Sequence, residues 1–169
     1  PHGPLMIQIE NLTKTFRQSR RIQIEAVRSI SLECRPGEVV GLLGPNGAGK
    51  TTILRMISTA LKPTAGRILV ADNDVVQHPD RVRSQIGFLS ATTGLYGRLT
   101  PAEILRYFGR LHGMQRQVLE KRLETLHERL NLKKILHQPC DKLSSGVKQR
   151  VGIARTLVHD PPVIVFDEP

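Results

Sequence analysis

The stretch Gly44-Pro45-Asn46-Gly47-Ala48-Gly49-Lys50-Thr51-Thr52 fits the pattern G-x-x-x-x-G-K-[ST], in which a glycine-rich loop wraps a phosphate group. The apolar residues 39–43 before it predict a buried strand. The residues after it predict a helix with Ile53, Leu54 and Ile57 on one face. Glycines let backbone N–H groups converge on an anion, and the positive end of the helix adds to the attraction. The order strand, loop, helix therefore predicts a nucleoside triphosphate site, in which Lys50 reaches the β- and γ-phosphates and Thr51 offers its hydroxyl to Mg²⁺.

The composition is that of an ordinary globular domain: 169 residues, of which 39% are hydrophobic and 24% charged. No apolar run approaches the roughly 18 residues of a membrane-spanning helix, and no signal-peptide pattern opens the chain. We therefore expect any membrane role to come through a partner. Residues 1–5 are expected to be a cloning remnant, with Met6 as the native start. Cys34 and Cys140 are far apart and form no C-x-x-C pattern, which favours reduced thiols in a cytosolic protein.

The net charge of +10 raises the question of nucleic acid. The dense basic cluster is confined to residues 17–21, with Lys133 and Lys134 as a weaker second. Aromatic residues make up only 4% of the chain, so no stacking platform for single strands is visible. A solvated basic loop, or a face that meets anionic lipid headgroups, accounts for the charge as well. We expect no nucleic-acid binding.

Hydrophobic periodicity predicts an α/β core that carries a helical insert. Period-two alternation at 6–12, 22–24 and 30–32 predicts strands, a turn follows at 35–38, and further strands are expected at 68–70 and 86–89. Thr100-Pro101-Ala102-Glu103 has the pattern of a capping box and begins a helix. A second helix is expected at 118–130, a third from Ser144 to His159, and a buried strand at 163–166.

Two further motifs follow the phosphate loop along the chain. Strand 163–166 leads into Asp167 and Glu168, and acids at the carboxyl end of a strand face the crevice where α/β sheets bind ligands. Asp167 is predicted to hold Mg²⁺, and Glu168 to polarise the water that attacks the γ-phosphate. Ser144 and Gly146 open the third helix and form a candidate anion site. Taken alone, the first motif could be a strand ending in exposed acids and the second a plain helix cap; the phosphate loop favours the functional interpretation.

In this order, the motifs resemble the ATP-binding cassette of ABC transporters. Residues 26–52 are similar to the opening of that family, and Leu143-Ser144-Ser145-Gly146-Val147-Lys148-Gln149-Arg150 resembles its signature motif L-S-G-G-Q. Asp160-Pro161-Pro162, leading into Asp167-Glu168-Pro169, resembles its Walker B segment. Residues 93–100 and 157–160 are similar to the sodium-efflux and multidrug-efflux branch of bacterial exporters.

The resemblance implies a P-loop NTPase core with an antiparallel β subdomain and an inserted helical subdomain at about 95–142, all within an ATP-binding domain at 6–169. Phe16 matches the aromatic residue that stacks on adenine, although a core aromatic remains the alternative. Residues 44–52 would hold ATP with Mg²⁺ on Thr51 and Asp167, and Glu168 would be catalytic. Ser144 and Gly146 would touch the γ-phosphate of ATP held by a second cassette.

For the whole protein, the resemblance implies an ATPase subunit of an exporter. Its partners would be a second cassette and a membrane-spanning permease, which would place it in the cytoplasm on the inner face of the membrane. ATP would hold the two cassettes together, hydrolysis would release them, and the helical subdomain would pass this motion to the permease.

The chain departs from the family pattern at three places. Ala91 stands where the family has Gln, and Ser90, Thr92 and Thr93 are the candidate replacements. Ser145 and Val147 replace Gly and Gln in the signature. The sequence ends at Pro169, before the family's D-loop, final strand and switch histidine, so we expect the last part of the core to be missing. We expect such a partial cassette to bind ATP weakly and to hydrolyse little of it.

Other interpretations stay open at this point. The chain could belong to a soluble ABC-type ATPase that acts on ribosomes or nucleic acid. A measured affinity for RNA that falls steeply with salt concentration would favour this interpretation. It could also be a nucleotide-binding fragment without activity. A P-loop kinase or a GTPase is the remote option, and the motif at residues 143–150 argues against both.

Overall fold

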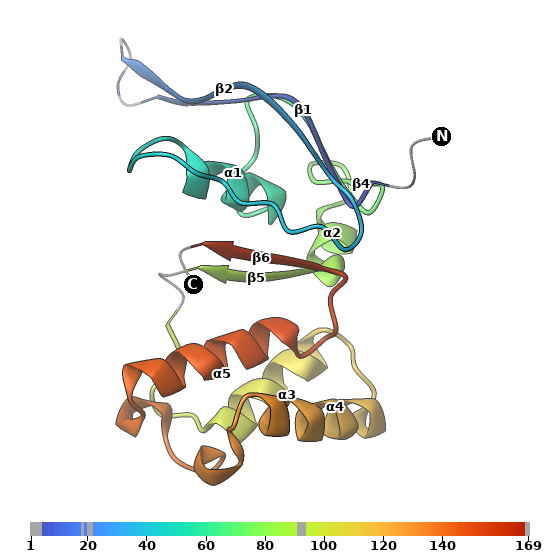
Figure 1. The fold of residues 1–169 in the computed structure, drawn as a ribbon, viewed down its shortest axis with the longest axis vertical. Helices are drawn as coiled ribbons and strands as arrows, with labels where there is room; N and C mark the ends of the chain where they lie inside the picture. The colour runs from blue at the N-terminus through green and yellow to red at the C-terminus, as the bar shows by residue number, and fades with distance from the viewer. Residues whose placement is uncertain (1–4, 18, 20–21, 91–93, 168–169) are drawn as a thin grey trace. The chain divides into compact units, whose positions relative to one another are not determined.

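The computed structural model describes residues 5–17, 19, 22–90 and 94–167. The chain divides into two compact units, residues 1–86 and 87–169 (Figure 1).

The first unit is built on a four-stranded antiparallel sheet in the order β2-β1-β3-β4. Its strands are β1 (Ile7–Arg17), β2 (Gln23–Cys34), β3 (Ala65–Val70) and β4 (Asn73–Asp74). The strand predicted at 6–12 is confirmed as part of β1. The two short strands predicted at 22–24 and 30–32 are wrong as separate elements, because both lie in the single strand β2.

Strand β2 stays continuous because side chains close the irregular points of its ladder with β1. Asn11 and Ser29 have φ values of 47° and 45° where the register shifts. At these points the Asn11 N–H donates to Ser31 Oγ at 3.0 Å, and the Ser29 N–H donates to Thr13 Oγ1 at 3.1 Å. Bulges of this kind leave backbone groups without a ladder partner, and here hydroxyl groups accept from them.

The buried strand predicted at residues 39–43 is wrong. The turn before it forms as expected, with the Glu38 N–H donating to Arg35 O at 3.1 Å. Residues 39–43 then run without helix or strand, and the side chains of Val39 and Leu43 are 99% and 97% exposed. An apolar run becomes a strand only where a neighbour pairs its backbone, and the sheet of the first unit does not take up these residues.

Helices α1 (Lys50–Ile57) and α2 (Pro79–Gln85) complete the first unit. The buried face of α1 consists of Ile53, Met56 and Ile57, so Met56 takes the place predicted for the half-buried Leu54. The buried face therefore still follows the 3.6-residue period of a helix, but it is rotated slightly around the helix axis from the predicted face.

Strands β5 (Ile86–Ser90) and β6 (Val163–Asp167) form a two-stranded sheet, which apart from Ile86 belongs to the second unit. Figure 1 draws both arrows in the same direction, so the pair is parallel and its connection must cross over. That connection contains α3 (Pro101–Leu111), α4 (Arg116–Arg129), two short 3₁₀ helices, η1 (Lys133–Ile135) and η2 (Cys140–Lys142), and α5 (Ser145–Leu157).

Strand β6 was predicted to be buried throughout, and the structure corrects this. Val163, Val165 and Asp167 are buried, whereas Ile164 and Phe166 are 48% and 39% exposed. The helices of the second unit lie on one side of the β5–β6 sheet, so only the face toward them is covered within that unit (Figure 1).

The capping box predicted at the start of α3 is confirmed. Glu103 N–H donates to Thr100 Oγ1 at 3.3 Å, and the Thr100 N–H donates to Glu103 Oε2 at 2.8 Å. Pro101 occupies the first helical position, where its missing N–H costs nothing. Two of the backbone donors at this helix end are thereby satisfied.

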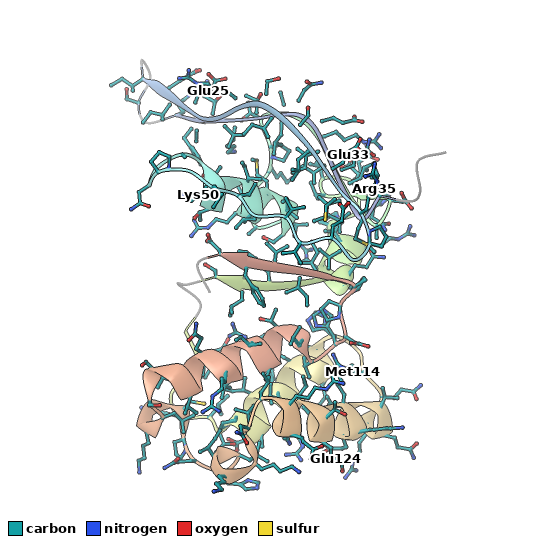
Figure 2. All side chains as sticks on the ribbon, in the orientation of Figure 1. Glu25, Glu33, Arg35, Lys50, Met114 and Glu124 are labelled. Carbon is teal, nitrogen blue, oxygen red and sulfur yellow. The ribbon has the colours of Figure 1, made fainter. Side chains whose placement is uncertain are left out.

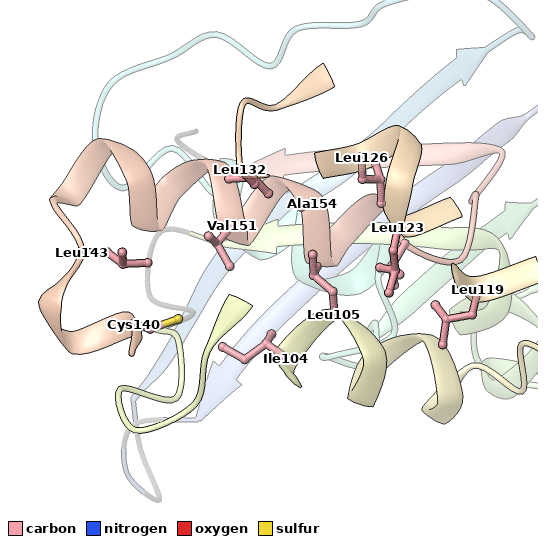
Figure 3. Packing of buried hydrophobic residues seen from close by; sticks show 11 residues of the cluster. Ile104, Leu105, Leu119, Leu123, Leu126, Leu132, Cys140, Leu143, Val151 and Ala154 are labelled. Atoms are coloured by element: carbon pink, nitrogen blue, oxygen red, sulfur yellow. The ribbon is translucent and has the colours of Figure 1, made fainter. Parts of the chain in front are cut away.

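A single apolar cluster holds α3, α4 and α5 together (Figure 3). Its largest fully buried members are Ile104, Leu105, Leu119, Leu123, Leu132 and Val151. Cys140 is also buried in this cluster, and both it and the half-buried Cys34 are free thiols. In the part of the chain that the structure describes, no helix is long and apolar enough to cross a membrane.

His127 of α4 makes the stability of the second unit depend on pH. Its side chain is 8% exposed, and within the described residues its Nε2 atom has no hydrogen-bond partner. Burial, followed by the charge of Arg106, lowers the pKa of His127, against the opposite effect of Glu120 and Glu124. The unfolded chain therefore binds the proton more readily, so stability is full above the unfolded pKa of about 6.5 and falls as the pH drops toward the folded pKa.

We predict that His127→Leu reduces the loss of unfolding free energy between pH 8 and pH 5 by about 1 kcal/mol, because no buried imidazole then has to be charged. Urea unfolding at the two pH values measures this. The matched control is His78→Leu, at an exposed position in the first unit. An equal effect of the two substitutions would contradict the assignment.

Candidate nucleotide site

The phosphate loop is an exposed segment that ends at the first residue of α1. Residues 44–48 are exposed, and the Ala48 N–H donates to Pro45 O at 3.1 Å, which folds the loop back on itself. Gly49 caps the helix with a φ of 85°. A Cβ atom there would lie 2.4 Å from the carbonyl oxygen of Ala26, so both the backbone conformation and the close approach require glycine.

Lys50 turns its ammonium group back onto the loop. Its Nζ atom donates to Gly44 O at 2.7 Å and to Pro45 O at 2.8 Å. Figure 2 labels Lys50 at the start of α1. An ammonium group has three donors, and two of them are used here on neutral carbonyl oxygens. Because hydrogen bonds to an anion are stronger, a phosphate group can displace these carbonyls.

The start of α1 carries no compensating negative charge. Its first turn contains no acidic residue, and Gly49 supplies no side-chain cap. The partial positive charge of the helix end therefore adds to that of Lys50. Thr51 and Thr52 follow in the same turn, and both are half-buried. Asn46 and Gly47 lie on the exposed part of the loop.

Phe16 lies near the end of β1, opposite Ile24 of β2. Its side chain is 40% exposed, so it is not a core aromatic. The ammonium of Lys14 lies 5.1 Å from the centre of the ring and donates to Lys62 O at 2.8 Å. The cation–π contact orients an aromatic ring that remains accessible to solvent.

The signature residues lie at the N-terminus of α5. Ser144 is the N-cap, is exposed, and makes no side-chain cap hydrogen bond, while its carbonyl accepts from the Lys148 N–H at 2.9 Å. A Cβ atom on Gly146 would meet nothing within 4 Å, so its surroundings are open. Leu143, directly before them, is buried in the apolar cluster and anchors this helix end.

Asp167 is the last residue of β6, and its side chain is buried. Ser90 is the last residue of β5, and it is buried as well. Because the two strands are parallel, both residues end at the same edge of the sheet (Figure 1). Of the candidates to replace the family's glutamine, only Ser90 is described; Ala91, Thr92, Thr93 and the predicted catalytic Glu168 lie outside the described residues.

The predicted site residues are thus divided between the units. The phosphate loop, Lys50, Thr51 and Phe16 belong to the first unit, and Ser144, Gly146 and Asp167 belong to the second. The described residues contain no group of three or more His, Cys, Asp or Glu side chains suited to a metal. The predicted donors, the Thr51 hydroxyl and the Asp167 carboxylate, are oxygen ligands of the kind Mg²⁺ prefers when phosphates supply the rest.

Sequence reasoning missed Arg155 in α5. Its side chain is only 7% exposed, and its Nη1 atom donates to Gly94 O at 3.3 Å. The signal was present: Arg155 falls on the same helix face as Val151, Ala154 and Val158, which are fully buried. A cation on an apolar helix face needs an explanation.

Comparison with known proteins gives a consistent result. The sequence model of the family described as ABC transporter matches residues 27–169. The ABC transporter ATP-binding protein NatA of Bacillus subtilis (strain 168) is 44% identical over 165 residues, which cover 97% of this chain and 67% of NatA. The probable multidrug ABC transporter ATP-binding protein YbhF of Escherichia coli (strain K12) is 34% identical over 167 residues, which cover 99% of this chain and 28% of YbhF.

Solved structures show the same fold. An ATP-binding subunit of an ABC transporter superposes with a TM-score of 0.86 at 27% identity, covering 97% of this chain and 66% of that one. A dimeric post-hydrolysis state of the ATP-binding cassette MJ0796, bound to ADP and Pi, gives a TM-score of 0.84 at 29% identity, with coverages of 97% and 74%. The fold is therefore the α/β fold of ABC ATPases with its antiparallel β subdomain and helices. With the family's sequence model matched from residue 27 onward, this chain belongs to the ATP-binding proteins of ABC transporters.

Proposed function

We propose that this chain is the ATP-binding and ATP-hydrolysing part of an ABC exporter. The observation that carries the proposal is the Lys50 ammonium, held within a glycine loop at a helix end without acidic residues. That arrangement attracts a triphosphate through backbone N–H groups and one mobile cation. The ATP-binding domain spans residues 6–169, with a helical subdomain at about 95–142.

The roles of the site residues follow from their chemistry. Residues 44–52 wrap the phosphates, Lys50 neutralises the β- and γ-phosphates, and Phe16 stacks on the adenine. Thr51 and Asp167 are the residues that would hold Mg²⁺, which would supply positive charge to the transferring phosphoryl group. Glu168 accepts the proton of the attacking water.

Two cassettes complete each other's sites in this proposal. Ser144 and Gly146 are exposed at the N-terminus of a 13-residue helix, so they are available to the γ-phosphate on a second cassette. ATP bound between the cassettes stabilises the dimer, and hydrolysis removes that stabilisation. The dimer acts on a membrane-spanning permease, which places the protein at the cytoplasmic face of the membrane. The resemblance of residues 93–100 and 157–160 to the efflux branch of the family favours export.

Glu168→Gln tests the hydrolytic role. We predict that kcat for ATP falls by about 10²–10⁴-fold, the range typical for loss of a general base, while the affinity for ATP stays within about twofold. Phosphate release and equilibrium titration with the protein at its natural length measure the two quantities. Size-exclusion chromatography with Mg-ATP should show a dimer that persists in this variant and is lost on adding Ser144→Arg, which places bulk at the exposed helix end. Hydrolysis that survives Glu168→Gln would refute the assignment of the base.

A further inference from the structure

Arg155 is a buried cation without a carboxylate partner in the described part of the chain. Its guanidinium lies 5.2 Å from the centre of the Phe108 ring, and its Nη1 atom donates to Gly94 O at 3.3 Å. The ion pairs found among the described residues do not include it. Arg155 therefore links three elements: α5, which carries it; α3, which carries Phe108; and the segment that follows β5.

Burial of this side chain works against folding. It lowers the pKa of Arg155, although an arginine remains charged at neutral pH. Because no carboxylate faces the guanidinium within the described residues, replacing it by an uncharged side chain of similar length leaves no opposite charge buried alone. The contacts that offset the cost of burial are the Phe108 ring and the Gly94 carbonyl, and the planar guanidinium reaches that one backbone carbonyl.

The segment that Arg155 contacts is also joined to the other end of α5. The Asp141 N–H donates to Gly97 O at 2.9 Å, and the Cys140 N–H donates to Leu99 O at 2.9 Å. Asp141 lies three residues before Ser144, and Cys140 is packed in the apolar cluster (Figure 3). Residues 94–99, which we call the post-β5 segment, are thus attached to α5 by Arg155 and to the entry of α5 by two backbone hydrogen bonds.

We propose that Arg155 is a positioning residue that fixes the post-β5 segment to helix α5, so that this segment and the signature residues Ser144 and Gly146 move as one body. The proposal deepens the proposed function and rests on it, since Ser144 and Gly146 matter there through a nucleotide on a second cassette. Besides the Gly94 contact, the segment is held by the two backbone hydrogen bonds from Cys140 and Asp141 and by Leu95 and Leu99, which pack against the apolar cluster.

Amide hydrogen exchange in the nucleotide-free protein, at its natural length, tests the attachment. We expect Arg155→Met to raise the exchange rates of the Leu99, Cys140 and Asp141 amides at least tenfold. Arg155→Lys, which keeps a donor but loses the planar fork, should give intermediate rates. The matched control is Arg122→Met, since Arg122 of α4 donates through Nη2 to Leu157 O in α5 at 3.0 Å rather than to the post-β5 segment. Unchanged exchange in Arg155→Met, or the same increase in the control, would overturn the proposal.

Steady-state kinetics separate positioning from a merely structural role. We expect Arg155→Met to lower kcat for ATP at least tenfold with a KM within twofold of the wild type. Arg155→Lys should recover part of kcat, and Arg122→Met should change neither kcat nor KM. A kcat within twofold of the wild type in Arg155→Met would overturn the positioning role. If Arg155→Met does not fold, the exchange rates and kcat are measured in Arg155→Lys instead. Wild-type values of both quantities in that variant would overturn the proposal. If the wild type binds no ATP, the proposed function fails, but the exchange comparison still decides the attachment.

Discussion

Replacing Lys50 by alanine should weaken Mg-ATP binding by roughly 30-fold, or about 2 kcal/mol, the size of charge-assisted hydrogen bonds lost to a phosphate. In the structure the ammonium already lies at the loop, on the carbonyls of Gly44 and Pro45. Binding therefore exchanges two neutral acceptors for an anionic one and requires little reordering of the side chain. The loss should be smaller for ADP, which offers no γ-phosphate.

Isothermal titration with Mg-ATP and Mg-ADP measures the effect. Lys62→Ala is the matched control, because it removes the same charge from an exposed position in the same unit. We expect the control to leave both affinities within twofold. Without nucleotide, the unfolding midpoint of Lys50→Ala should stay within about 2 °C of the wild type, as for other partly exposed substitutions. An unchanged ATP affinity would remove Lys50, and with it the phosphate loop, from the proposed site.

Gly66→Ala should destabilise the first unit by at least about 3 kcal/mol. This loss has two sources: the left-handed backbone conformation, which alanine disfavours, and a steric overlap of the added Cβ atom. Gly66 has a φ of 84° and lies in β3, where the register with β1 shifts. A Cβ atom there would lie 2.4 Å from the carbonyl oxygen of Asn11 and 2.5 Å from that of Glu10. Both are backbone atoms of a paired strand, so relief requires that β1 and β3 separate.

The control for this prediction isolates the overlap. Gly37 has nearly the same φ, 79°, but a Cβ atom there would meet nothing within 4 Å. Gly37→Ala should therefore cost only about 1 kcal/mol, the conformational part alone. Urea unfolding followed by circular dichroism gives both values. Equal losses of unfolding free energy in the two variants would show that the close approach at Gly66 does not contribute to the destabilisation.

Among the elements that the sequence predicted correctly, several have purely local signals. The capping box at Thr100 and Glu103 formed as predicted, because its partners are three residues apart. The turn at residues 35–38 and the helix after the phosphate loop have the same short-range origin. The ABC family itself could be inferred from the order of three short motifs, and the family match confirms that inference.

The errors lie where partners distant in sequence decide the outcome. Residues 39–43 and 163–166 are both apolar runs, but only the second is a strand, and it is buried on one face alone. No pattern within either run tells which neighbour will pair with its backbone or cover its faces. Likewise, the single strand β2 depends on hydroxyl groups of Thr13 and Ser31 that accept from the irregular points of the ladder.

For the site, the sequence by itself determined the chemistry: which residues carry the loop, the cation, the acids and the signature. Only the tertiary structure decided how these groups are held. It placed the Lys50 ammonium on two loop carbonyls, left the signature residues exposed at a helix end, and joined Arg155 to Gly94 across 61 positions. The physical reason is that motifs encode chemistry in neighbouring residues, whereas orientation depends on contacts that exist only once distant segments have packed together.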